Sequence, residues 1–108
     1  MLIRRKMMVY LYVRQTVADY ARWKEGFDNE LATRQAGGAT REALMLRNVE
    51  DPHEVIVLLG WHDLAQARLF AKSVSWQVAM ERMGVVGVPE VRKIWYVLIA
   101  SGDNMSGI

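Results

Sequence analysis

The stretch EVIVLLGW, residues 54–61, decides the fold because it is apolar on both of its alternating faces. Side chains alternate across a strand, so the odd-numbered residues from Val55 to Trp61 share one face, while Ile56 and Leu58 share the other. An antiparallel strand with one face in water would alternate apolar with polar residues. This strand is therefore predicted to be covered on both faces.

Two further stretches, residues 7–13 and 91–99, show the same two-sided apolar pattern. If helices cover one face of the resulting sheet, the other would present about ten large side chains, an apolar patch on the order of 1,000 Å². Monomeric proteins rarely expose so large a patch. We therefore expect a homodimer that forms through the uncovered sheet faces. The pattern leaves open which face Tyr10, Tyr12 and Tyr96 occupy.

Length and composition predict one domain over residues 1–100 and a flexible tail over residues 101–108. The chain has 108 residues, of which 52% are hydrophobic and 24% charged, as in ordinary globular proteins. It has no cysteine, which excludes disulfides and thiolate metal sites and fits a cytoplasmic location. No apolar run reaches the roughly 20 residues that span a bilayer, so we expect no membrane partner.

The charge pattern gives no nucleic-acid footprint. The net charge of +2 comes from 14 basic and 12 acidic residues spread along the chain. Arg4, Arg5 and Lys6 form the one tight basic cluster, which is typical of a solvated strand entrance. We therefore expect no nucleic-acid partner.

The remaining elements follow from spacing and turn signals. Thr16 is a predicted N-cap for a helix that ends at Gly37 and Gly38 and whose apolar stripe runs from Tyr20 to Leu31. A strand over residues 40–48, a turn at 50–53, a helix at 63–73, a short helix at 76–83 and a last strand from residue 91 complete the chain. The fold is predicted to be α+β, ferredoxin-like, in the order β-α-β-β-α-β with an antiparallel sheet.

Three stretches carry a family resemblance: VADYARWKEGFDNELATRQAGG at 17–38, RNVEDPHEVIVLLGWHDLAQARLFAKS at 47–73, and AMERMGVVGVPEV at 79–91. They resemble the antibiotic-biosynthesis monooxygenase-like proteins of the dimeric α+β barrel superfamily, over about residues 7–98. These segments build the fold and contain no catalytic signature.

The resemblance implies a dimer closed through facing sheets and a small-molecule pocket inside each subunit, between the sheet and its helices. It also implies oxidation of a small aromatic or polyketide-type molecule by O₂ without metal or flavin, so we expect no cofactor. Such chemistry needs a base, a positive charge and the exclusion of water around an acidic substrate. Five residues would bind the ligand as walls of this pocket, or would otherwise belong to an ordinary hydrophobic core. They are Trp23, Phe27, Phe70, Trp76 and Met80.

Two residues are candidates for catalysis. Arg34 lies late in the first predicted helix and would either hold an anion in the pocket or cap the helix and face water. His62 follows a strand and would serve either as a general base or as a solvated strand-end histidine. His53 falls in a predicted exposed turn, and the two histidines form no metal-ligand pattern, so no metal site is expected.

Three other functions compete with the monooxygenase reading. A non-catalytic ligand-binding or structural homodimer is favoured by the absence of a compact acid, base and nucleophile group. Haem cleavage is disfavoured because that branch uses an asparagine in the first strand and a helical histidine, both missing here. An RNA-binding module shares the element order, but residues 53–62, HEVIVLLGWH, lack its basic and glycine-aromatic pattern.

Overall fold

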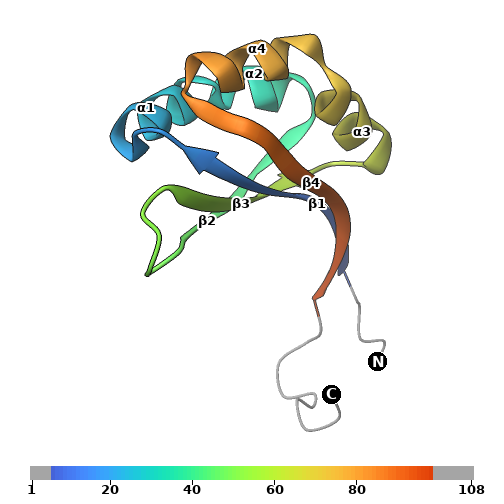
Figure 1. Cartoon of the computed structure of the whole chain (residues 1–108). Helices are drawn as coiled ribbons and strands as arrows, with labels where there is room; N and C mark the ends of the chain where they lie inside the picture. Colours follow the sequence, from blue (N-terminus) through green and yellow to red (C-terminus); the bar gives the residue numbers. More distant parts are fainter. Residues whose placement is uncertain (1–5, 99–108) are drawn as a thin grey trace, which may run out of the picture.

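A computed structural model describes residues 6–98, so Arg4, Arg5 and the predicted tail at 101–108 lie outside the described residues. In the described part, the strands form one antiparallel sheet in the order β2-β3-β1-β4, and the helices lie on one of its faces (Figure 1). The predicted α+β, ferredoxin-like order is confirmed, with a pair of short helices at each helical position. The elements are β1 Lys6–Val17, α1 Tyr20–Asn29, α2 Leu31–Ala36, β2 Ala39–Arg47, β3 Glu54–Trp61, α3 Leu64–Lys72, α4 Val74–Arg82 and β4 Val85–Leu98.

The core lies between the sheet and the helices and is centred on β1 and β3. Leu11 is opposite Leu59 and Val13 is opposite Val57 in their antiparallel register. All four side chains are buried, as is Trp23 of α1, which packs against them. The odd-numbered face of β3 therefore points toward the helices, as its alternation predicts.

The first helix differs from its prediction at both ends. Thr16 belongs to β1, so its predicted capping role is wrong; Asp19 is the N-cap and accepts a hydrogen bond from the Ala21 backbone N–H at 3.0 Å. The helix also breaks at Glu30 instead of running to Gly37. Because of this break, Leu31 leaves the predicted apolar stripe and is exposed.

The second helical pair is organised by side-chain caps. Asp63 caps α3 by accepting from the Gln66 backbone N–H at 2.8 Å, and Ser73 caps α4 by accepting from the Trp76 backbone N–H at 3.2 Å. Ser73 Oγ also donates to the Phe70 carbonyl at 2.9 Å, which closes the end of α3. One serine thus ends one helix and starts the next.

The last strand begins at Val85, six residues before the predicted start at residue 91. Gly87 has φ +73°, a left-handed conformation that favours glycine, and it lies where the β1–β4 register shifts between Arg14 and Thr16. The glycine absorbs the irregularity, and pairing therefore continues on both sides of it. Within GVVGVP, residues 85–89 are therefore strand rather than connection.

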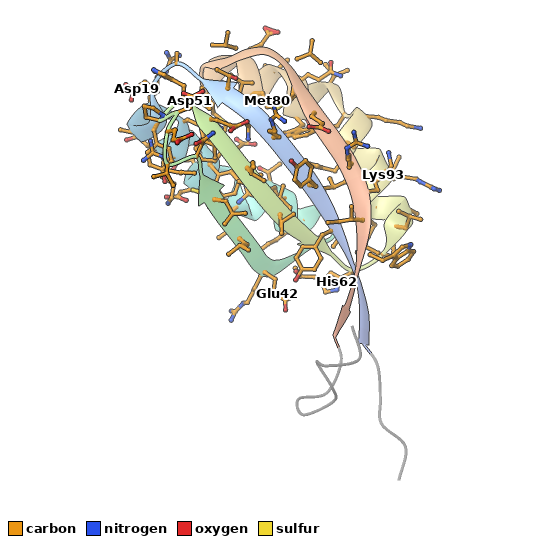
Figure 2. All side chains as sticks on the ribbon, turned by 60° about the horizontal axis from the view of Figure 1, so that its bottom comes forward. Asp19, Glu42, Asp51, His62, Met80 and Lys93 are labelled. Atoms are coloured by element: carbon orange, nitrogen blue, oxygen red, sulfur yellow. The ribbon has the colours of Figure 1, made fainter. Side chains whose placement is uncertain are left out.

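The face of the sheet away from the helices carries no covering element in residues 6–98 (Figures 1 and 2). Cross-strand pairs show that the apolar side chains on it come from all four strands. We call it the open face, and its apolar residues are Tyr10, Tyr12, Leu44, Leu46, Ile56, Leu58 and Ile94. Of the three tyrosines whose face the pattern left open, Tyr10 and Tyr12 are therefore on the side away from the helices.

Candidate functional site

A cavity lies between the sheet and the helices, where the fold leaves the core incompletely filled. Its sheet side is formed by Val13, Val57 and Leu59, and its helix side by residues of α1, α2, α3 and α4. The lining includes every residue predicted to form its walls: Trp23, Phe27, Phe70, Trp76 and Met80. We call this space the inner cavity.

Aromatic side chains form two of its walls. On the α1 side, Trp23 and Phe27 stack with ring centroids 5.0 Å apart and an interplanar angle of 20°. On the other side, the Phe70 ring centroid lies 4.8 Å from the ring centroids of both Trp61 and Trp76, and the rings are tilted relative to one another. These contacts fix flat apolar surfaces on two sides of the space, which suits a flat ligand.

Arg34 brings a positive charge into this apolar environment. The residue is only 6% exposed and lines the inner cavity. Its guanidinium donates one hydrogen bond to the Phe27 carbonyl at 2.9 Å and lies 4.0 Å above the Phe27 ring centroid. Arg34 therefore faces the cavity and also caps a carbonyl in the last turn of α1, so features of both sequence interpretations are present. Its role in holding an anion stays a prediction.

No carboxylate within residues 6–98 forms an ion pair with Arg34. Burial lowers the pKa of its guanidinium from the usual value, while the negative charges of Glu30 and Asp28 act in the opposite direction. An arginine nevertheless stays protonated at neutral pH. The inner cavity thus contains a desolvated cation that forms no direct ion pair within residues 6–98, although the Glu30 carboxylate acts on it at longer range.

Gln15 is a second polar group of the lining, and the sequence interpretation missed it. It is 6% exposed, and its Oε1 atom is buried without a hydrogen-bond partner in the described structure. The indole N–H of Trp23 is also buried without a partner. Buried polar atoms are usually satisfied, so these two leave hydrogen-bonding capacity unused at the cavity wall.

Glu30 supplies the lining with a carboxylate, which was also missed. It occupies the junction at which α1 ends and α2 begins, and its backbone N–H bonds to the carbonyls of Gly26 and Phe27, both at 3.2 Å. The helix break therefore positions this half-buried side chain at the cavity. Neither glycine nor proline marks the break in the sequence, and so no local signal predicted it.

The histidines are not part of this site. His62 is exposed, does not line the inner cavity, and lies toward the opposite end of the sheet from Met80 (Figure 2). His53 is in the turn before β3, where its Nδ1 is 2.9 Å from the Val17 carbonyl oxygen. Within residues 6–98, no group of three or more His, Cys, Asp or Glu side chains is arranged to hold a metal ion.

The inner cavity is nearly closed. Its free volume is about 20 Å³, on the order of a single water molecule. A ring-sized ligand needs a space on the order of 150 Å³, so side chains of the wall must move for any aromatic molecule to enter. Met80 and Met83 are the flexible members of the lining, and methionine adapts its shape readily.

Among the helices of residues 6–98, none has the length and apolar character needed to cross a membrane. No protein-family model matches the chain, and no curated protein matches its sequence. Solved structures, in contrast, match over most of its length.

Three of these structures illustrate the match. A proposed antibiotic-biosynthesis monooxygenase from Bordetella bronchiseptica has a TM-score of 0.71 at 16% identity, covering 86% of this chain and 100% of its own. SnoaB, a cofactor-independent oxygenase from Streptomyces nogalater, has a TM-score of 0.61 at 10% identity, covering 91% and 98%. A proposed antibiotic-biosynthesis monooxygenase from Caulobacter crescentus has a TM-score of 0.62 at 16% identity, covering 81% and 87%.

Identities this low carry the fold and not the chemistry, because one fold supports many functions. The resemblance stated from the sequence is thereby confirmed in architecture. The chain has the ferredoxin-like α+β fold of the structures described as antibiotic-biosynthesis monooxygenases.

Proposed function

We propose that this protein is monooxygenase-like: it binds a small acidic aromatic or polyketide-type molecule between sheet and helices and oxidises it with O₂ without a cofactor. The observation that carries the proposal is Arg34, a buried cation that forms no ion pair within residues 6–98 and lines an aromatic-walled cavity. An unpaired buried charge is costly unless a ligand uses it. The oxygenase described for SnoaB, on the same fold, supports the reaction class.

Each group of the cavity has a role in this reaction. A phenolic substrate must lose a proton before its electron-rich anion reacts with O₂, and the Arg34 charge lowers the pKa of that phenol. The Glu30 carboxylate accepts the proton. The walls formed by Trp23, Phe27 and Phe70 exclude water, which strengthens the attraction between the anion and the guanidinium.

The reaction balances without an external reductant. When a methylene flanked by aromatic rings becomes a carbonyl, the substrate gives up four electrons and two protons on carbon. One oxygen atom of O₂ enters the carbonyl and the other leaves as water. The substrate is therefore the sole reductant, and no electron carrier is needed.

The test is O₂ uptake with anthrone, a tricyclic ketone that is acidic through its phenolic tautomer. We expect one O₂ consumed per anthraquinone formed, at a rate above that of buffer, and a loss on the order of a hundredfold in Arg34→Met. Arg68→Gln is the matched control, because Arg68 is an exposed helical arginine. Uptake at the buffer rate in the unmodified protein would overturn the catalytic proposal.

The alternative is a protein that binds such a molecule without turning it over. It is favoured by the nearly closed cavity and by the exposed position of His62, outside the lining. Quenching of tryptophan fluorescence by an acidic aromatic ligand, without O₂ uptake, would establish binding alone. Loss of that quenching in Arg34→Met would assign the binding to this cavity.

We also propose that the protein is a homodimer formed through the open face. Leu44 and Leu46 are exposed there, and Tyr12, Ile56 and Leu58 are only partly covered. A continuous apolar surface across four strands is unfavourable in water, and a second sheet would cover it. Sedimentation equilibrium should give twice the chain mass of 12.4 kDa, whereas a single chain mass at micromolar concentration would contradict the dimer.

A further inference from the structure

A groove runs between α4 and β4, on the outer side of the inner cavity. Its volume is about 400 Å³, which is enough for a molecule of several fused rings. The β4 wall is apolar and includes Val85, Val88 and Pro89, and the α4 wall includes Trp76 and Gln77. Val88 is 95% exposed, so this wall faces solvent without a covering side chain.

The groove and the inner cavity share two wall residues, Trp76 and Met80. These side chains are therefore the partition between a large outer space and a small inner one. Met80 is unbranched and has three rotatable side-chain bonds, so a change of rotamer requires no movement of the backbone. If its side chain swings away, the two spaces join into one.

The charges at the two ends differ. The inner end has the Arg34 guanidinium, the unpartnered Oε1 of Gln15 and the half-buried Glu30 carboxylate, and Arg34 is the one cation among the described residues that line either space. Glu81 stands at the groove, where its carboxylate repels anions. An acidic molecule is thus favoured with its acid group inward and its apolar part outward.

We infer that the α4–β4 groove is the outer half of the same binding site, and that the ligand is an elongated aromatic acid or phenol. Its acidic head pairs with Arg34, its flat body passes between Trp76 and Met80, and its far rings lie along Val88 and Pro89. This inference rests on the proposed function, because it takes the inner cavity as the place of the acidic group. It adds the length and polarity of the ligand and the route by which it enters.

The experiment is a fluorescence titration with anthracene-2-carboxylate, a rigid three-ring acid, and with its neutral analogue 2-anthracenemethanol. The affinity of benzoate, measured by its competition with the three-ring acid, reports the contribution of the acidic group without the additional rings. In the unmodified protein we expect the three-ring acid to bind at least about tenfold more tightly than either the alcohol or benzoate.

Two exposed valines give a matched pair of variants. Val88→Asn changes the groove wall, whereas Val49→Asn changes a valine that is 98% exposed in the turn before β3. We expect Val88→Asn to weaken binding of the three-ring acid by roughly tenfold, the effect of losing about 50 Å² of apolar contact, and to leave benzoate unchanged. Val49→Asn should change neither.

The outcomes separate this inference from the proposed function. If Val88→Asn binds the three-ring acid as tightly as the unmodified protein does, while Arg34→Met binds it less tightly, the groove is not part of the binding site. The proposed role of Arg34 is then kept. Equal affinity of acid and alcohol, unaffected by Arg34→Met, would overturn the acidic head and with it both proposals. Absence of binding by the three-ring acid would overturn both as well.

Discussion

The two faces of this sheet are made by the same strands, yet they differ in whether the charged side chains on or beside them form ion pairs. On the helix-covered face the buried strand residues are apolar except for Gln15, and the buried charge beside them, Arg34, comes from a helix and has no ion-pair partner in the described residues. On the open face, Arg14 pairs with Glu54 at 2.7 Å and approaches Glu90 at 3.7 Å. The buried charge is thus unpaired, whereas these exposed charges are paired.

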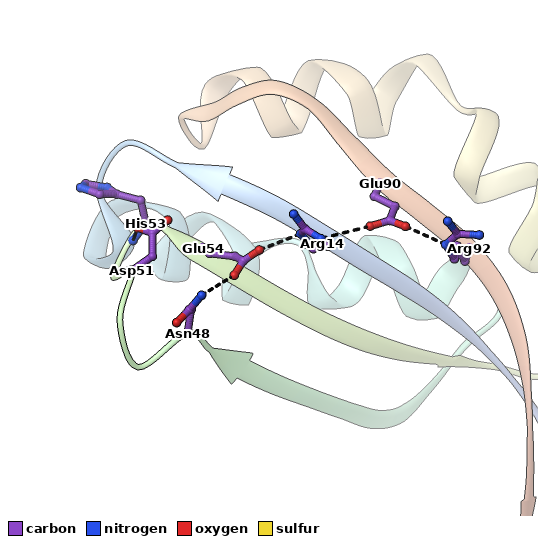
Figure 3. Close-up of polar contacts among 7 residues, drawn as sticks. All are labelled: Arg14, Asn48, Asp51, His53, Glu54, Glu90 and Arg92. Atoms are coloured by element: carbon purple, nitrogen blue, oxygen red, sulfur yellow. Dashed lines mark hydrogen bonds and ion pairs between the residues drawn. The ribbon is translucent and has the colours of Figure 1, made fainter.

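This distribution is the reverse of what stability alone would select. Buried charges are normally paired, whereas exposed ones need no partner because water solvates them. On the open face the paired charges form a row across the strands, from Glu54 through Arg14 and Glu90 to Arg92, and the Asn48 amide donates to Glu54 at its start (Figure 3). Internal pairing makes this row compatible with coverage by a second subunit. The unpaired cation on the other face is instead available to a ligand.

The largest expected effect comes from placing a charge in the centre of the open face. Leu58 lies between Tyr12 and Leu44 in the sheet. In Leu58→Arg, a dimer through this face would bury an unpaired cation, a cost of about 4 kcal/mol and roughly a thousandfold in the dimer dissociation constant. Sedimentation velocity over a concentration series measures it, with Val49→Arg as the exposed control. A dimer of unchanged affinity would place the interface elsewhere.

A somewhat smaller effect is expected on the helix-covered face. Leu11 is fully buried at the centre of β1. Leu11→Ala removes three buried carbons and should lower the free energy of unfolding by about 3 kcal/mol, measured by urea denaturation. Leu44→Ala, at an exposed position of the open face, is the matched control and should cost less than about 1 kcal/mol in the monomer. Equal losses in both variants would mean that the two faces are not differently packed.

The sequence predicts the elements whose boundaries carry a chemical signal. The strand predicted at 54–61 is confirmed at both ends. The turn before it and the Asp63 cap after it fix where the strand must begin and end. Continued alternation through Val9, Leu11 and Val13 also reaches Gln15, so extending the first strand by two positions would have placed that side chain at the cavity.

The features that the sequence did not predict depend on tertiary contacts. The break at Glu30 has no glycine or proline to announce it, yet it positions a carboxylate at the cavity. The start of β4 was missed because Gly87 and Pro89 resemble a connection, whereas the β1 register irregularity accommodates them within a strand. The orientation of Arg34 depends on a carbonyl seven residues earlier and on the Phe27 ring, and helical spacing alone does not fix either contact.

The smallest effect is expected from the charged row itself. Arg14 is about half exposed, and exposed ion pairs contribute at most about 1 kcal/mol, so Arg14→Gln should lower the free energy of unfolding by less than that. The loss should shrink further at high salt because screening weakens the exposed pairs that the substitution removes. Urea denaturation at two salt concentrations measures it, with Lys24→Gln, which breaks an exposed helical pair with Asp28, as control. In the proposed dimer the same change leaves Glu54 without a cation beneath a partner sheet, while Glu90 keeps its pair with Arg92, so dimer dissociation should respond more strongly than monomer stability. An equal response of both quantities would place the row outside the interface.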